Sequence, residues 1–498
     1  MLTRAFALAL LLASSGIAHA LDPALVAKLA GDNDQKIAAI GELVATGDPD
    51  ALPLLKSMAD GELKVDGQEV VVNNRVRREI ESAMAALKLV SPQADVRAAA
   101  VRELAGSTDE SMIPLVKKAL ARETDPGIRE ALEMVAAALD LKSSDRAARL
   151  AAVKRLATSS NPSTKTLLLP LADKSEADED VRREALASLK AVDARLSRAQ
   201  FVGLIFSGVS LGSILLLAAL GLAITYGLMG VINMAHGELI MIGAYATYVV
   251  QNLFRGYWPA GFDWYLAAAV PTAFIASALV GMALERSVIR WLYGRPLETL
   301  LATWGISLIL IQAVRTLFGA QNVQVENPAF MSGGLEILTG VVLPWSRVVI
   351  IGFAAVVLAA MGLLLARTRL GLFVRGVTQN RAMAACVGVP TARVDTWAFG
   401  LGSGLAGLAG CALSQIGNVG PELGQSYIVD SFMVVVLGGV GQLAGTVYAA
   451  LGLGFANKLL ESWSGAVLAK IAVLVFIIVF IQKRPQGLFA LRGRAVES

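Results

Sequence analysis

The sequence predicts an all-α protein in two unlike parts, a soluble α-solenoid followed by a polytopic membrane helical bundle of about eight hydrophobic spans. Of its 498 residues, 55% are hydrophobic and only 17% are charged, which lies outside the range of soluble globular proteins. Of the 40 Asp and Glu residues, 29 precede residue 200, and the rest of the chain alternates long apolar runs with short basic loops. The small net charge of +4 gives no reason to expect a nucleic acid partner.

Residues 1–20 have the features of a secretory signal peptide. Arg4 precedes a short apolar run, and a small-x-small cleavage sequence ends at Ala20. The run is too short to cross a bilayer, although an uncleaved first membrane helix is the alternative. Cleavage would place the next segment outside the cytoplasm, in the periplasm of a Gram-negative cell. Both cysteines lie in the hydrophobic part, so the exported part cannot form a disulfide.

Residues 21–199 repeat themselves. The sequence RAAAVRELA, Arg97 to Ala105, returns as RLAAVKRLA, Arg149 to Ala157, and a weaker copy begins at Lys36. Helical pairs that recur at roughly 50 to 60 residues are typical of a HEAT-like helical repeat domain. Asp66-Gly67, between alternating residues, predicts a hairpin insertion. Since solenoids present extended binding faces, we predict a periplasmic docking module, with a plain spacer as the alternative.

Residues 200–498 are predicted to form the transmembrane domain, because each crossing needs about 20 apolar residues. The expected spans are 203–228, 237–254, 264–285, 297–318, 346–366, 396–416, 431–457 and 464–483. Short loops rich in arginine and lysine normally face the cytoplasm. The residues that mark this side are Arg286, Arg290, Arg295, Arg367, Arg369, Arg375, Arg381, Lys483, Arg484, Arg492 and Arg494.

An exported N-terminal domain and a cytoplasmic C-terminus require an odd number of crossings, which eight full spans would violate. Glycines interrupt the segment 431–457 around Gly438-Gly439 and Gly441. We therefore predict a broken helix or re-entrant hairpin there, which is tolerated at membrane depth when protein or a water-filled cavity covers it. One span lying along the interface is the alternative.

Polar residues within the apolar runs are the candidate translocation path, since such residues are costly in hydrocarbon unless they serve a polar route. The predicted path residues are Asn233, His236, Glu238, Trp304, Ser307 and Gln442. For the first three, the alternative is that they cap a helix break and face cytoplasmic water. For the others, it is a helix–helix hydrogen bond. Together they suit a neutral, strongly hydrogen-bonding solute better than an ion.

The sequence predicts no enzyme, no cofactor and no metal site. His236 and Glu238 are two residues apart, so on one helix they point in different directions and cannot form a metal-binding pair. The only other histidine is His19, in the predicted signal peptide, which leaves no basis for an intramembrane hydrolase. No GxxxxGK[ST] motif occurs, so any ATP must be hydrolysed by another chain.

The longest polar insertion on the predicted cytoplasmic side is the 369–395 loop, Arg369 to Asp395. Its core, Thr378 to Val387, predicts about three helical turns lying flat under the membrane. Arg375 and Arg381 are then available to acidic partners. A peripheral helix of this kind would fit a groove on a motor subunit.

The block LGLAITYGLMGVINMAHGELIMIGAY resembles the membrane permeases of branched-chain amino acid type ABC importers. Gly371 to Val389 is similar to the coupling loop of that family, and VVLGGVGQLAGTVYAALGLG and RPQGLFAL are similar to its C-terminal blocks. The exported helical extension resembles one branch, the urea permease subunits. Two further runs, RPLETLLATWGISL and LSQIGNVGPELGQSYIVDSF, also resemble that branch.

This resemblance implies an importer subunit in the bacterial inner membrane that lines half of a urea path. Its partners would be a second homologous permease, two cytoplasmic ABC ATPase subunits, a periplasmic solute-binding protein and the lipid bilayer. It assigns ATPase coupling to Arg375, Gln379, Asn380, Arg381, Ala384 and Gly388. Import of branched-chain amino acids or short amides is one alternative, and a passive urea channel is another.

Overall fold

The computed structural model describes residues 23–46, 51–65, 68–70, 72–89, 91, 93–104, 113–143, 145–173, 176, 178–338 and 341–489. The chain divides into two compact units, Met1–Arg198 and Ala199–Ser498. Each unit is described by itself. The predicted signal peptide and the Asp66-Gly67 turn lie outside the described residues.

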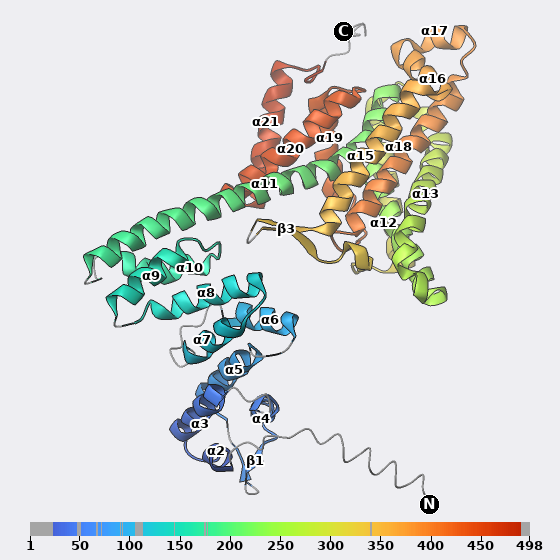
Figure 1. The fold of residues 1–498 in the computed structure, drawn as a ribbon. Coiled ribbons are helices and arrows are strands. Elements are labelled where there is room, and N and C mark those ends of the chain that lie inside the picture. Colours follow the sequence, from blue (N-terminus) through green and yellow to red (C-terminus); the bar gives the residue numbers. More distant parts are fainter. Residues whose placement is uncertain are drawn as a thin grey trace, which may run out of the picture. The chain divides into compact units, whose positions relative to one another are not determined.

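The first unit consists of short helices that pack in consecutive pairs around an aliphatic core (Figure 1). A two-stranded antiparallel ribbon, β1 (Lys64–Val65) and β2 (Gln68–Glu69), stands at the predicted hairpin. The helices are α2 (Pro23–Lys28), α3 (Asn33–Thr46), α4 (Ala51–Ala59), α5 (Asn74–Lys88), α6 (Ala94–Leu104), α7 (Ile113–Arg122), α8 (Pro126–Asp140), α9 (Arg146–Leu156) and α10 (Ser163–Ala172).

In two successive repeats, an arginine at the equivalent position connects the equivalent loops. Arg97 donates to both oxygens of Glu123, at 2.8 and 3.0 Å, and to the Ser91 carbonyl at 3.0 Å. One repeat later, Arg149 donates to the Ser143 carbonyl at 3.1 Å. Its guanidinium lies 3.7 Å from Glu176. The sequence repeat therefore corresponds to a repeated contact, while the HEAT-like assignment and the export of this domain stay predictions.

Glu123→Gln is expected to lower the melting temperature of the first unit by several degrees at neutral pH. The hydrogen bond from Arg97 is the main cause that lowers the pKa of the Glu123 carboxyl from 4.5 to about 2. A carboxyl whose pKa falls on folding adds stability above its unfolded value and loses it as pH falls toward the folded value. The difference between variant and wild type should thus shrink between about pH 4.5 and 2, measured by thermal unfolding.

The matched control is Glu103→Gln, because Glu103 makes an exposed pair with Lys88 at 3.3 Å. Exposed pairs contribute little to stability, so this variant should unfold like wild type. Equal melting temperatures for Glu123→Gln and Glu103→Gln would contradict the prediction.

The second unit is a helical bundle that begins within α11 (Glu179–Met229). Its other elements are α12 (His236–Tyr257), the 3-10 helix η2 (Pro259–Trp264), α13 (Tyr265–Ser287), η3 (Ile289–Leu292), α14 (Pro296–Phe318), η4 (Ala329–Met331), β3 (Gly334–Leu338), β4 (Val341–Pro344), α15 (Trp345–Arg367), α16 (Arg369–Gln379), α17 (Arg381–Cys386), α18 (Thr391–Ser414), α19 (Gln425–Gly438), α20 (Leu443–Ser464) and α21 (Ala466–Lys483). The strands β3 and β4 form an antiparallel hairpin.

Within the described residues, seven helices are long and apolar enough to span a membrane. They lie in α11, η2 with α13, α14, α15, α18, α20 and α21. The predicted span at 237–254 corresponds to α12, which is not one of the seven because glycine, tyrosine and polar residues lower its mean hydropathy. These helices confirm the predicted polytopic helical membrane fold.

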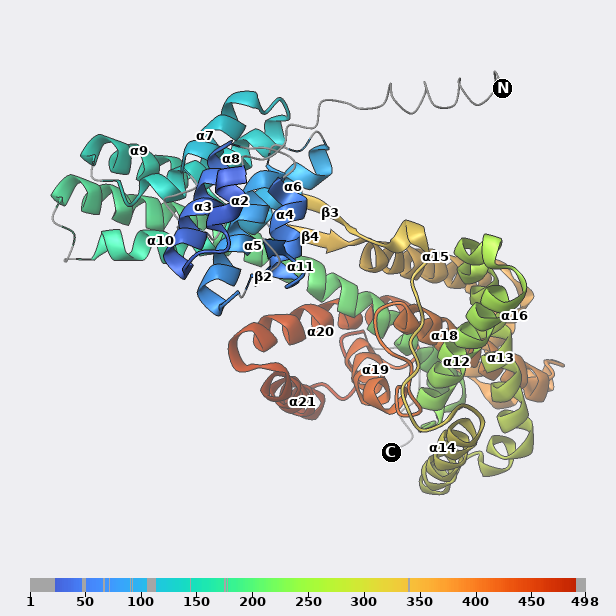
Figure 2. The ribbon, with the colours of Figure 1, turned by 90° about the horizontal axis from the view of Figure 1, so that it is seen from below.

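The helix α18 lies at the centre of one part of the bundle, against α12 and α13 (Figure 2). Its stretch from Gly400 to Gly410 is largely buried. Small residues there let the neighbouring backbones approach closely. The helices α19, α20 and α21 form a second group in which α20 packs on both neighbours.

The predicted span 431–457 is not one helix. The helix α19 ends at Gly438 and α20 begins at Leu443. Gly439 and Gly441 between them have φ of 98° and 80°, a backbone region that disfavours other residues. The two helices pack as a hairpin, which confirms the predicted break at these glycines.

Candidate functional site

The chain turns back into the bundle between α11 and α12. Residues 230–235 are not helical, and the Nε2 atom of His236 lies 3.0 Å from the Ala218 carbonyl. Ala218 is three helical turns before Met229, the last residue of α11, which corresponds to about 16 Å along the helix axis. The helix α12 therefore begins beside α11 about three turns before the end of α11, as in the broken helices that form transporter sites.

One face of α14 covers this irregular segment. The Thr303 hydroxyl accepts a hydrogen bond from the Met234 amide at 3.2 Å. One turn further along α14, the Ser307 side chain lies beside the Glu238 carboxyl group. Thr303 and Ser307 lie on one face of α14, since residues four apart are neighbours on a helix. The segment and α14 thus form one polar layer.

A cavity of about 230 Å³ opens beside Asn233. Its lining is otherwise apolar and comes from α11, the irregular segment, α14 and α19: Leu222, Ile232, Met234, Leu300, Ile428, Val429 and Phe432. The side-chain oxygen of Asn233 accepts from the Ala235 amide at 3.0 Å, and its amide nitrogen is buried beside the cavity, whose accessible surface is apolar. We call this space the Asn233 cavity.

Between residues 230 and 238, three buried side-chain polar atoms have no hydrogen-bond partner among the described residues: Asn233 Nδ2, His236 Nδ1 and Glu238 Oε2. These residues are exposed by 2%, 0% and 2%. Since the Ala218 carbonyl can only accept, His236 Nε2 carries the proton in neutral imidazole and Nδ1 is an acceptor. The segment therefore offers one amide donor and two acceptors. Buried groups of this kind normally have a protein group or an ordered water as their partner.

The structure does not bring all six predicted path residues together. Asn233, Glu238 and Ser307 belong to the polar layer, while the His236 ring faces α11. Trp304 is 50% exposed on the outer side of α14. Gln442 lies in the turn between α19 and α20, where it lines a different cavity.

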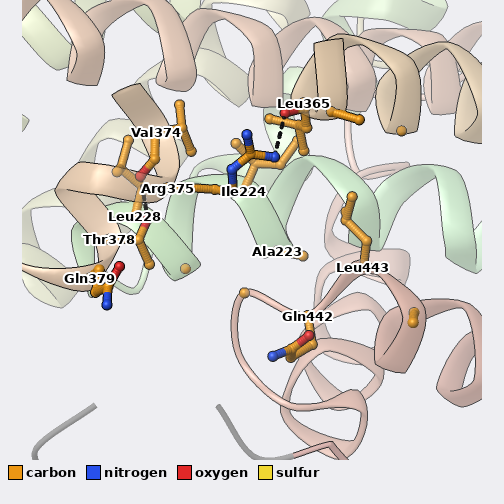
Figure 3. Close-up of a pocket in the computed structure, with 15 residues that line it drawn as sticks. Ala223, Ile224, Leu228, Leu365, Val374, Arg375, Thr378, Gln379, Gln442 and Leu443 are labelled. Atoms are coloured by element: carbon orange, nitrogen blue, oxygen red, sulfur yellow. Dashed lines mark hydrogen bonds between the residues drawn. The ribbon is translucent and has the colours of Figure 1, made fainter. Parts of the chain in front are cut away.

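That second cavity has a volume of about 580 Å³ (Figure 3). It lies at the end of the bundle marked by the basic loops, which we call the basic end. Figure 3 shows Arg375, Thr378 and Gln379 of α16 on one side and Gln442 on the other. Arg375 donates to the Leu365 carbonyl at the end of α15, at 2.8 Å. We call this space the basic-end cavity.

The predicted helix from Thr378 to Val387 is divided in the structure. The helix α16 ends at Gln379 and α17 begins at Arg381. Asn380 lies between them in an extended conformation, and its side chain accepts from the Met383 amide at 3.0 Å. Asparagine is favoured at the N-cap of a helix because its side-chain oxygen accepts a hydrogen bond from a free backbone amide. Asn380 therefore begins a new helix, and the expectation of one continuous helix was wrong.

Arg381 is engaged within the chain rather than free. Its guanidinium forms an ion pair with both oxygens of Asp395 in the second turn of α18. It also donates to the Tyr293 hydroxyl at 2.9 Å and lies 4.3 Å above the Tyr293 ring. Burial raises the pKa of Tyr293, so that hydroxyl stays protonated at neutral pH. This corrects the expectation that Arg381 is available to acidic partners.

The next residue of α18 makes a second connection. The Thr396 hydroxyl donates to Glu285 of α13 at 2.7 Å, and Arg290 lies 3.8 Å from the same carboxylate. Asp395 and Thr396 therefore connect α17 to α18 and α18 to α13. Ala384 is buried in α17, and Gly388 follows it with a φ of 89°. The second turn of α18 thus contacts both α17 and α13.

Residues 204–482 match the family model described as branched-chain amino acid transport system / permease component. This match covers more than half of the 498 residues. The chain belongs to this permease family. Like its relatives, it is a transport permease and not an enzyme.

Curated relatives agree with this assignment. The permease is 30% identical over 298 residues to LivH, a high-affinity branched-chain amino acid transport system permease protein of Escherichia coli K12, covering 58% of this chain and 95% of the relative. It is 28% identical over 300 residues to LivH of Salmonella typhimurium, with the same coverage. It is 27% identical over 301 residues to LivM of that organism, covering 55% of this chain and 67% of the relative. No solved structure matches.

Sequence reasoning missed several polar partners in the permease. Asp395 and Tyr293 hold Arg381, and Lys470 of α21 lies 3.3 Å from Asp430 of α19. An acidic residue at the edge of an apolar run, facing a loop arginine, is the signal that would have suggested the first pair. The second joins residues far apart in the sequence, and only packing identifies it.

Proposed function

We propose that the permease forms half of the path of an ATP-driven importer for urea. The observation that carries this assignment is the set of unpartnered groups in the polar layer, an amide donor at Asn233 and a carboxylate acceptor at Glu238. Urea has one carbonyl acceptor and two amino donors, so it can satisfy both kinds of group at once. An ion would leave one of them without a partner.

The N-terminal unit supports the same branch. The LivH relatives of Escherichia coli and Salmonella typhimurium are matched over 95% of their length by 58% of this chain. The first unit therefore has no counterpart in those matches. We propose that it is an exported helical repeat domain that docks the solute-binding protein.

The proposed assembly adds a second homologous permease and two cytoplasmic ATPases. The ATPases would contact α16, α17 and the following turn, with Arg375, Gln379, Asn380 and Gly388 at this surface and Ala384 buried beneath it. Arg381 would act as a positioning residue that transmits the movement of α17 to α18. The bacterial inner membrane is the proposed location.

Import of branched-chain amino acids is a second candidate function. The relatives are named for that transport, and the Asn233 cavity has an aliphatic lining that suits an apolar side chain. Competition experiments separate the two candidates. Uptake of labelled urea should fall with excess unlabelled urea and stay unchanged with excess leucine, whereas strong inhibition by leucine would contradict the urea assignment. Acetamide tests short amides in the same assay.

Asn233→Leu is expected to lower urea uptake about tenfold, because a buried donor for the solute is lost. The matched control is Asn252→Leu, at an exposed position of α12. Both variants are measured in liposomes that contain the purified complex, with and without ATP. Full uptake by Asn233→Leu would contradict the proposed site, and equal uptake without ATP would instead indicate a passive channel.

A further inference from the structure

The basic-end cavity lies on the opposite side of α11 from the Asn233 cavity. Leu222 lines the Asn233 cavity, whereas Ala223, Ile224, Gly227 and Leu228 line the basic-end cavity. At 100° per residue, these four positions point between about 100° and 240° away from Leu222. The larger cavity is therefore separate from the polar layer, and the proposed solute path does not account for it.

The lining of this cavity combines an apolar floor with a polar rim. The floor consists of aliphatic residues and small residues from α11, α15 and α20, among them Ile224, Leu365 and Leu443. The rim carries the guanidinium of Arg375 and the carboxamides of Gln379 and Gln442. A ligand that fits has acyl chains for the floor and an oxygen-rich anionic head group for the rim.

The charge around the cavity is positive. Residues 337–394 contain no Asp or Glu, and the same holds for the other lining segments, 223–228 and 441–444. Arg367 and Arg369 flank the junction of α15 and α16 beside Arg375. Asp395, the first acidic residue after this region, is already paired with Arg381. An anionic head group would meet no opposing carboxylate in these segments.

We propose that the basic-end cavity binds an anionic phospholipid of the cytoplasmic leaflet. Basic pockets between membrane helices on the cytoplasmic side are suited to such lipids, because the head group gains ion pairs while the acyl chains stay in an apolar environment. Arg375 would hold the phosphate, and Gln379 and Gln442 would donate to its oxygens. Since α16 forms one wall, bound lipid would stabilise the position of the coupling element.

The test measures lipid retained by the purified full-length chain, with the subunits that copurify, by native mass spectrometry. Mixed micelles contain phosphatidylglycerol or phosphatidylcholine. Gly362 lines the cavity, and a Cβ at this position would meet no atom within 4 Å, so Gly362→Leu is chosen to add a side chain to the cavity wall. Gly352 of α15 is equally open but does not line it, which makes Gly352→Leu the matched control.

Wild type and Gly352→Leu are expected to retain phosphatidylglycerol in preference to phosphatidylcholine, and Gly362→Leu to lose it. Arg375→Gln should weaken retention about fivefold, and Arg367→Gln, outside the lining, should have a smaller effect. Equal retention of the two lipids by wild type would overturn the proposal. Unchanged retention of phosphatidylglycerol by Gly362→Leu would also overturn the proposal. If that variant retained the lipid but lost urea uptake, the cavity would be assigned to the solute.

Discussion

Asp395→Arg is expected to abolish solute uptake while the permease still inserts into the membrane. Asp395 is 2% exposed and pairs with Arg381, so the substitution places two cations in contact at the start of α18. Breaking a buried ion pair lowers the free energy of unfolding by about 3–5 kcal/mol. We expect a loss of about 3 kcal/mol here, because the Arg381 side chain is 39% exposed. The helix α17 would separate from α18, so the proposed coupling of the ATPases to the bundle would be lost.

The charge exchange, Arg381→Asp with Asp395→Arg, should restore part of the uptake. Recovery is incomplete because an arginine at position 395 cannot reproduce the stacking of Arg381 on Tyr293. The matched control is Arg393→Asp, an exposed residue in the first turn of α18, which should transport at close to the wild-type rate. Uptake and ATP hydrolysis are measured together in liposomes. Normal uptake by Asp395→Arg would show that this pair is not needed for coupling.

Gly424→Val is expected to remove folded, active permease almost completely. A Cβ at Gly424 would lie 1.9 Å from the Gly237 carbonyl oxygen and 2.2 Å from its carbon. These two glycines join the starts of α12 and α19 by backbone contact, so the clash cannot be relieved by turning a side chain. Overpacking of a protein interior commonly lowers the free energy of unfolding by about 1–3 kcal/mol. We expect a loss at the upper end of this range, because the clash is with backbone atoms.

Gly237→Ala should be milder, since its Cβ would lie 2.7 Å from the Gly424 carbonyl oxygen. The matched control is Gly417→Val, because a Cβ at Gly417 in the same loop as Gly424 meets no atom within 4 Å. Size-exclusion chromatography in detergent and urea uptake report folding and activity separately. If Gly424→Val elutes and transports like Gly417→Val, the close approach of the two helices is not required.

Much of the membrane fold could be predicted from the sequence because spans need long apolar runs and broken helices need glycines. The break at Gly439 and Gly441 is an example. The end of the predicted coupling helix was less accessible, since asparagine at position 380 is compatible with both a helix and a cap. Only its side-chain hydrogen bond to the Met383 amide distinguishes the two.

By itself, the sequence determined that this chain is a helical membrane permease and that Asn233, His236 and Glu238 interrupt a long apolar stretch, because hydropathy and local spacing are properties of contiguous residues. The tertiary structure decided which polar groups meet. It places Ser307 against Glu238, Arg381 against Asp395, and Gln442 with α16 rather than with Asn233. Such pairings depend on how helices far apart in the chain turn and pack, and no local pattern encodes them.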